Sequence, residues 1–325
     1  MYRLGFGTLR LPVEAEEGQL VEIVKKAYQL GIRYFDCAPT YCGGKCEKIV
    51  GTAVKDFRQD VMLASKIPLD VLKKQGDLLN ILRMSLKNLQ TDHLDYYFFW
   101  GVKRKEFEEV ALGKGFLQEM YQAKKEGLIR NVGFSFHDTP EYAMDIIEAA
   151  EAAGCPFDAM LSQYNILDRR MEPWIQEAKS KGITNLIMGA AAGGKLDYEV
   201  AYPFVWENPN VDCLLSGFQT LDMVEQNISL EQKSHGLTTE ALRRIEEELL
   251  KKKVLKDLYC TGCGYCMPCP AGINIPEEMG KVQKAYKERK VYHPEVEVCM
   301  NCGRCEKKCP QGLPVRIFMK KIKEE

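Results

Sequence analysis

Short apolar segments that alternate with helical ones constrain the fold of this chain more than any other feature. Seven such segments are rich in β-branched or aromatic residues, and they cover residues 32–38, 61–67, 94–102, 131–136, 158–166, 184–191 and 211–218. The opening RLGFGTLRL supplies an eighth. Continuous apolar runs of this length are typical of strands buried on both faces of a parallel sheet.

The segments between these runs place apolar residues three and four positions apart, as an amphipathic helix does. Examples are LVEIVKKAYQLGI, LLNILRMSLKNL, FLQEMYQAKKEGLI and AMDIIEAAEAAG. The alternation predicts βαβ units and a parallel sheet. Eight strands suit a closed (β/α)8 barrel, or TIM barrel. A doubly wound open sheet is the alternative, but no G-x-G-x-x-G follows the first strand.

The sequence pattern changes near residue 237, which predicts a boundary. Residues 237–257 form a charged amphipathic pattern, so we expect a connecting helix that Thr239 caps. Residues 258–325 are rich in Cys and interrupted by Pro, with too little apolar sequence for a large core. We therefore predict a barrel over 1–236, a connecting helix, and a small α-rich, Cys-rich ferredoxin-like domain over 258–325.

The chain contains 13 cysteines, which indicate metal or redox chemistry rather than a disulfide framework. Eight of them form two runs, CTGCGYCMPCP and CMNCGRCEKKCP. The second run has the spacing of bacterial ferredoxins, in which the fourth Cys ligates the other cluster. Structural zinc is the alternative, but two uninterrupted runs of four Cys, each followed by Pro, fit zinc poorly.

The ferredoxin pattern, carried over residue by residue, predicts two interleaved 4Fe–4S clusters. The first cluster would use Cys260, Cys263, Cys266 and Cys309, and the second would use Cys299, Cys302, Cys305 and Cys269. The last gap in the first run is two residues rather than three, which departs from the pattern. Two clusters with interleaved ligands lie close together, so the domain is predicted to transfer electrons.

Charge and hydropathy exclude several other classes of protein. Lys and Arg total 45 against 46 Asp and Glu, so the net charge of -1 argues against a general nucleic-acid or membrane-surface binder. No apolar run approaches the ~20 residues that span a bilayer. The N-terminal residues lack the apolar stretch of a signal peptide. We expect a cytoplasmic protein.

Several motifs follow the predicted strands in a fixed order: GIRYFDCAPTY, LASKI, VGFSFHD, LSQYN and the glycine pair of AAAGGKL. In these motifs the chain resembles the aldo-keto reductase superfamily, in particular its branch with a C-terminal ferredoxin-like domain. The resemblance implies a catalytic set of Asp, Tyr, Lys and His at the barrel mouth. The matching residues are Asp36, Tyr41 and Lys66, with Tyr41 as proton donor to a carbonyl.

Elementary acid–base chemistry supports these roles independently. A Tyr with an ordinary pKa near 10 is a poor acid–base catalyst at neutral pH, and a buried Lys beside it lowers that pKa. Trp100 stands where the family usually has its His, and an indole donates one hydrogen bond but cannot act as a base. His137, one strand later, could reach the same mouth, although a loop role is the simpler interpretation.

The resemblance also implies a nucleotide site, which this sequence keeps only in part. Ser135 and Gln163 would hold the nicotinamide carboxamide, and Gly217, Thr220 and Asn227 would lie along the nucleotide. The basic residues that usually bind the 2′-phosphate are replaced, by Gln219 and Met223 among others. A phosphate without a cation loses charge-assisted hydrogen bonds. The sequence therefore argues against NADPH binding and, somewhat less strongly, against NADH.

Three further cysteines surround the predicted catalytic residues: Cys37, Cys42 and Cys46. They admit three interpretations, namely compact apolar substitutions, redox-active thiols, or ligands of a third Fe–S cluster with one iron open to substrate. Cys155 and Cys213 are expected to be core residues.

Together these features predict an iron–sulfur oxidoreductase of anaerobic metabolism. Its barrel would act on a small organic substrate with Tyr41 as proton donor or acceptor, and electrons would pass through the C-terminal clusters. A redox partner such as a ferredoxin or flavoprotein is expected. The alternatives are an NAD(P)H-dependent carbonyl reductase with accessory clusters, and a non-catalytic electron-transfer subunit of a larger redox complex.

Overall fold

The computed structural model describes residues 3–194, 196–233, 240, 243, 260–288, 299–309, 313 and 315–319. The chain divides into two compact units, one made of residues 1–190 and 201–237, the other of residues 191–200 and 238–325. Apart from Glu240 and Arg243, the predicted connecting helix and its cap Thr239 lie outside the described residues. Within the described part of the chain, every helix is too short or too polar to cross a membrane.

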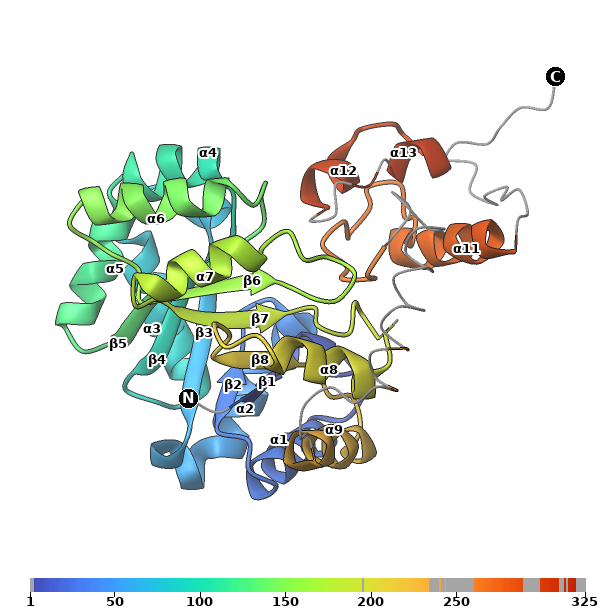
Figure 1. The fold of residues 1–325 in the computed structure, drawn as a ribbon. Coiled ribbons are helices and arrows are strands. Elements are labelled where there is room, and N and C mark those ends of the chain that lie inside the picture. Colours follow the sequence, from blue (N-terminus) through green and yellow to red (C-terminus); the bar gives the residue numbers. More distant parts are fainter. Residues whose placement is uncertain are drawn as a thin grey trace. The chain divides into compact units, whose positions relative to one another are not determined.

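The first unit is a closed barrel of eight parallel strands, as the sequence predicted (Figure 1). The strands are β1 (Leu4–Gly7), β2 (Tyr34–Asp36), β3 (Met62–Pro68), β4 (Leu94–Val102), β5 (Ile129–Phe136), β6 (Ala159–Gln163), β7 (Thr184–Met188) and β8 (Cys213–Ser216). Each strand pairs with its neighbour in sequence, and β1 closes the barrel against β8. The (β/α)8 prediction is confirmed, and the doubly wound alternative is wrong.

Helices cover the outside of the barrel (Figure 1). They are α1 (Glu17–Gln29), α2 (Cys46–Val54), α3 (Asp77–Leu89), α4 (Arg104–Glu106), α5 (Phe116–Lys125), α6 (Tyr142–Ala152), α7 (Glu172–Ser180), α8 (Tyr198–Trp206) and α9 (Leu221–Lys233). Helix α3 shows why they form: its buried Leu78, Leu82, Leu86 and Leu89 recur at helical spacing on one face. Short helical turns interrupt the loops at η1 (Thr8–Arg10), η2 (Tyr41–Gly44), η3 (Lys55–Asp60), η4 (Leu69–Val71) and η5 (Phe107–Leu112).

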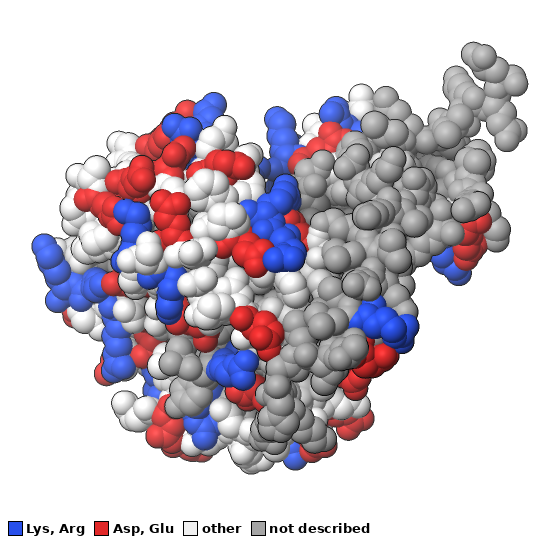
Figure 2. Space-filling view, in the orientation of Figure 1, with Lys and Arg blue, Asp and Glu red and all other residues white. Residues whose placement is uncertain are grey.

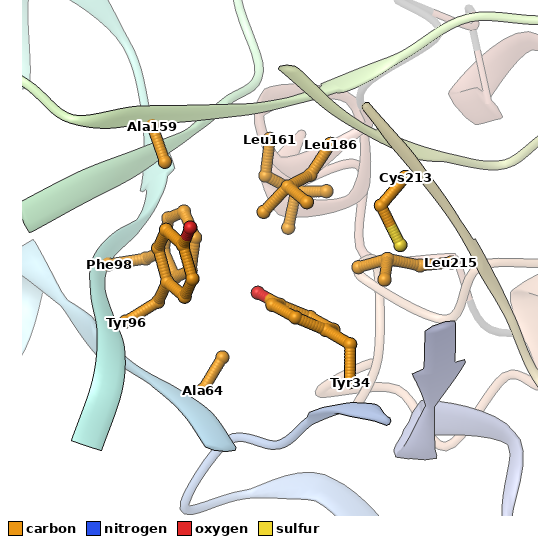
Figure 3. Packing of buried hydrophobic residues seen from close by; sticks show 9 residues of the cluster. All are labelled: Tyr34, Ala64, Tyr96, Phe98, Ala159, Leu161, Leu186, Cys213 and Leu215. Carbon is orange, nitrogen blue, oxygen red and sulfur yellow. The ribbon is translucent and has the colours of Figure 1, made fainter. Parts of the chain in front are cut away.

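The barrel interior is filled by side chains from six of the strands, β2, β3, β4, β6, β7 and β8 (Figure 3). The cluster comprises Tyr34, Ala64, Tyr96, Phe98, Ala159, Leu161, Leu186, Cys213 and Leu215. Phe98 takes the space beside Gly133, where a Cβ would lie 2.4 Å from the Phe98 ring. The glycine of VGFSFHD is therefore needed for the packing of the barrel core.

Three carboxylates at the N-terminal ends of alternate strands fix the register of the barrel. Asp95, Asp158 and Asp212 lie at the starts of β4, β6 and β8, and each accepts a backbone N–H from the preceding strand, at 2.8–2.9 Å. Each also pairs with a cation: Asp95 with Arg58 and Arg130, Asp158 with Lys124, and Asp212 with Lys179. A shift of one strand by one residue would break these bonds, because it would move each carboxylate away from its donor.

Replacing Asp95 with Ala is expected to lower the free energy of unfolding by about 3 kcal/mol. The change leaves the Leu63 N–H without its acceptor and the half-buried Arg58 guanidinium without its carboxylate. Urea unfolding measures the loss. Asp95→Asn, which keeps an acceptor oxygen but removes the charge, should cost less. Equal midpoints for Asp95→Ala and the parent chain would contradict this role.

The described surface mixes charges of both signs. Figure 2 shows Lys and Arg side chains interspersed with Asp and Glu on the visible face of the chain. Many are paired locally, as in Arg104 with Glu108 and Arg169 with Glu172. On this face, the described residues show no extended field of one sign.

Among the described residues, the second unit contains the helices α11 (Ile275–Lys287), α12 (Arg304–Lys308) and α13 (Val315–Phe318). It also includes the first three residues of α8, residues 198–200. Its buried core is small and consists of Ile273, Ile275, Met279, Leu313, Val315 and Met319. Six of the eight cysteines from the two runs pack against this core. The core is therefore built around the thiols.

Candidate active site

The predicted catalytic and nicotinamide-binding residues occupy a second inward-facing layer of the barrel. Asp36, Lys66, Trp100 and Gln163 each lie two positions beyond a residue of the core cluster: Tyr34, Ala64, Phe98 and Leu161. Side chains two apart on a strand share a face. The layer is nearer to the C-terminal ends of the strands, where barrels of this kind build their active sites.

Lys66 links Asp36 to Tyr41. Its ammonium forms a buried ion pair with Asp36 Oδ1, donates to the Cys37 carbonyl at 2.9 Å, and lies 5.0 Å from the centre of the Tyr41 ring. The exposed fractions of Asp36, Tyr41 and Lys66 are 3%, 5% and 1%. Burial raises the pKa of Asp36, and the Lys66 charge partly offsets that rise. The ammonium thus contacts both the Asp36 carboxylate and the face of the Tyr41 ring.

Backbone conformation places Tyr41 beside this ion pair. Tyr41 begins η2, and the next three residues, Cys42, Gly43 and Gly44, have φ values of 53°, 62° and 86°. Left-handed conformations are readily adopted by glycine and unusual for other residues, so the Gly-Gly pair makes the tight turn available. The turn returns the chain to α2 directly after Tyr41.

Trp100 forms the wall of the site next to Tyr41. The two rings meet edge to face, with centroids 5.4 Å apart and planes at 89°. This is a favourable aromatic geometry. Trp100, which stands in place of the expected His, therefore restricts the movement of the Tyr41 ring and presents an apolar surface to the site.

The eight C-terminal cysteines lie in the second unit, in two loops. Cys260, Cys263, Cys266 and Cys309 line one pocket, together with Ile275, Met279 and other apolar residues. Burial and the neighbouring thiols raise the pKa of Cys266 to about 12. The Gly262 N–H lies 3.4 Å from Cys260 Sγ and donates to it. The four cysteines line one pocket, but among the described residues no three potential metal ligands lie close enough together to hold a metal ion. The assignment of a cluster to these residues therefore rests on the cysteine spacing and on sulfur as the donor atom. In the second run, burial raises the pKa of Cys305.

Comparison with known proteins identifies both units. The description "Aldo/keto reductase family" matches residues 3–203, and "4Fe-4S dicluster domain" matches residues 259–313. The chain belongs to the aldo/keto reductase family. Its expected fold, its expected dicluster domain and its class as an oxidoreductase agree with these matches.

Individual relatives support the same assignment. Aldo-keto reductase YhdN of Bacillus subtilis is 30% identical over 224 residues, which cover 64% of this chain and 64% of YhdN. Methylglyoxal reductase DkgB of Escherichia coli O157:H7 is 32% identical over 185 residues, which cover 55% of this chain and 62% of DkgB. The match thus spans less than two thirds of either relative. The structure of aldo-keto reductase AKR11C1 from Bacillus halodurans has the same fold, with a TM-score of 0.63 and 24% identity over 75% of this chain and 91% of that one.

The residues that an aldo/keto reductase would use for its nucleotide are present but partly engaged within the protein. The Thr220 hydroxyl accepts the Met223 N–H at the start of α9, and Asn227 donates to the Met223 carbonyl. Gly217 packs against the Arg10 side chain, because a Cβ there would lie 2.7 Å from Arg10 Cγ. Ser135 and Gln163 lie at the barrel mouth, Ser135 buried and Gln163 half-buried. Thr220 and Asn227 are therefore engaged in hydrogen bonds with the backbone of Met223.

His137 also lies at the barrel mouth, although a loop role is the simpler interpretation of its place in the sequence. It follows β5, and its Nδ1 lies 3.2 Å from the Ser135 carbonyl oxygen. A carbonyl oxygen only accepts, so Nδ1 carries the proton and Nε2 has the lone pair. Burial, with the charges of Lys103 and Lys66, lowers the pKa of His137 to about 4. The imidazole is therefore neutral at pH 7.

This low pKa predicts that the barrel loses stability in mild acid. Between the unfolded value of 6.5 and the folded value of about 4, the unfolded chain binds a proton that the folded chain does not. The free energy of unfolding should therefore fall by up to about 3 kcal/mol as the pH drops through this window. Urea unfolding of His137→Gln, with His93→Gln as the control, measures it. A steep pH dependence that survives in His137→Gln would contradict the assignment.

Cys37, Cys42 and Cys46 are buried, and Cys46 is linked through Thr8 to the backbone of Asp36. The Thr8 hydroxyl donates its proton to the Asp36 carbonyl at 2.7 Å, so at the 2.8 Å contact with Cys46 Sγ it accepts from the thiol. Burial raises the pKa of Cys37 and of Cys42, which opposes thiolate reactivity. This arrangement favours the compact-substitution interpretation. The third cluster stays a prediction.

Proposed function

We propose that this aldo/keto reductase is an iron–sulfur oxidoreductase that acts on a small organic substrate in its barrel. The observation that carries the proposal is the buried Asp36–Lys66–Tyr41 arrangement in a chain that also holds a dicluster domain. The 4Fe–4S clusters would supply or accept single electrons. Cys260, Cys263, Cys266 and Cys309 would hold one of them, and Cys299, Cys302, Cys305 and Cys269 the other.

The barrel residues would supply the proton that the substrate oxygen gains. A carbonyl that becomes an alcohol gains two electrons, which the clusters would deliver one at a time, and two protons. Tyr41 Oη would donate the proton that binds to oxygen, and solvent water would supply the proton that binds to carbon. The Lys66 ammonium stabilises the phenolate that remains, and Asp36 holds the ammonium in position. Trp100 shields the Tyr41 ring from water on one side. In the reverse direction Tyr41 accepts the proton.

An NAD(P)H-dependent carbonyl reductase is the second candidate. Aldo/keto reductases usually bind NADP, and the relative DkgB is named as a methylglyoxal reductase. Ser135 and Gln163 would hold the nicotinamide carboxamide. In this alternative the clusters are accessory, and a reactive carbonyl compound is the expected substrate class.

Anaerobic purification followed by iron and sulfide analysis and nicotinamide titration separates these candidates. The proposal expects about eight irons per chain, weak NADPH and NADH binding, and turnover that requires intact clusters. A count of about twelve irons per chain would indicate a third cluster at Cys37, Cys42 and Cys46. Tight nicotinamide binding with full turnover after cluster removal would overturn the proposal in favour of the carbonyl reductase.

A further inference from the structure

The second cysteine loop carries the most accessible sulfur of the dicluster domain. Of the eight cysteines in the two runs, Cys302 is the exposed one, whereas the other seven are half-buried. Its neighbour Met300 is 65% exposed. A cluster held by this loop would therefore lie at the protein surface, where the distance to the redox centre of a partner protein is short.

The same loop continues into a helix whose exposed face is basic. Helix α12 (Arg304–Lys308) exposes Arg304, Lys307 and Lys308 within five residues (Figure 1). Such a concentration of one sign contrasts with the mixed charges of the described barrel surface.

The one acidic residue of α12 is engaged on the inner side of the loop. Glu306 accepts the backbone N–H of Arg316 at 2.8 Å and its Nε at 2.7 Å, and pairs with its Nη2 at 2.7 Å. Gly303, which precedes α12, has a φ of 71°, a left-handed conformation that glycine adopts readily. Because Glu306 is paired with Arg316, the exposed charged side chains that α12 presents are Arg304, Lys307 and Lys308.

We propose that Met300, Cys302 and the basic residues of α12 form the docking surface for an acidic one-electron carrier protein. The inference rests on the proposed function and adds the site and the charge of the partner. One electron leaves the reduced carrier and enters the cluster of the second loop, and no bond forms or breaks. Basic residues around an exposed redox centre steer a carboxylate-rich partner and raise the association rate at low ionic strength.

Charge reversal on α12 tests the proposal. The probe is a reduced acidic two-iron ferredoxin, and the measurement is the stopped-flow rate at which it reduces the clusters of the intact holoprotein. Arg304→Glu/Lys307→Glu/Lys308→Glu should slow this reaction at least about tenfold at low salt and abolish its decline with added salt. Lys284→Glu, on the exposed side of α11, is the matched control and should change the rate little.

Further measurements separate docking from the loss of a cluster and from the proposed function. Iron content and reduction by the photogenerated deazaflavin radical, which is neutral and small, should be equal in all variants. Equal ferredoxin rates in every variant at every salt concentration would overturn the docking surface and leave the proposed function intact. A DNA oligonucleotide is the further control. If it bound as tightly as oxidised ferredoxin and with the same salt dependence, the surface would be a general polyanion site, and the docking proposal would be overturned. Full substrate turnover in cluster-free protein would instead overturn the proposed function.

Discussion

Tyr41→Phe is expected to lower kcat for the barrel substrate by about 10²- to 10⁴-fold, the usual contribution of a positioned proton donor. The substitution removes Oη and leaves the ring, so the edge-to-face contact with Trp100 and the fold should remain. Because the proton is needed only in the chemical step, KM should change much less than kcat. Chemical reduction of the clusters should proceed at the parent rate.

Tyr34→Phe is the matched control for this prediction. Tyr34 lies on β2 two positions before Asp36, and its hydroxyl is buried in the barrel core without a hydrogen-bond partner (Figure 3). Loss of that hydroxyl should leave turnover within a few-fold of the parent. Unchanged turnover in Tyr41→Phe itself would exclude the proposed proton donor and favour the interpretation that the barrel serves as a scaffold in a larger redox complex.

The barrel could be predicted because its strands are buried on both faces. The segment LDYYFFWGV is apolar or aromatic except for Asp95 at its start, and β4 covers Leu94–Val102 as expected. The positions of Asp36, Tyr41 and Lys66 follow from the same pattern, since parallel strands bring their C-terminal ends to one mouth. Periodicity and strand order are enough for this much of the site.

Contacts that depend on the meeting of distant segments could not be predicted. The bonds from Asp95, Asp158 and Asp212 to preceding strands require the register, which residue types alone do not specify. The role of Thr8, which joins Cys46 to the Asp36 carbonyl, requires the end of β1 to lie against α2. The pairing of Glu306 with Arg316 likewise depends on the fold of the small domain.

Cys266→Ala is expected to remove one cluster and to destabilise the dicluster domain. The hydrophobic cluster at the core of this domain comprises six buried apolar side chains among the described residues, so the folding of the domain depends on the clusters. Iron content should fall by about four per chain. The barrel, with its own core, should retain its thermal transition. Cys155→Ala, which changes a buried thiol of the barrel, is the control and should lose no iron. A Cys266→Ala protein with its full iron content would contradict the ligand assignment.

A double variant decides how the ligands are shared between the two clusters. Cys309 comes from the second run but lines the pocket of Cys260, Cys263 and Cys266, which indicates interleaved ligation. If that is correct, Cys266→Ala/Cys309→Ala removes two ligands of the same cluster, and the loss stays at about four irons. If each run held its own cluster, the double variant would damage both and lose about eight. Anaerobic iron analysis with electron paramagnetic resonance of the reduced protein distinguishes these results, because interleaved ligation predicts that the signal of the second-loop cluster persists.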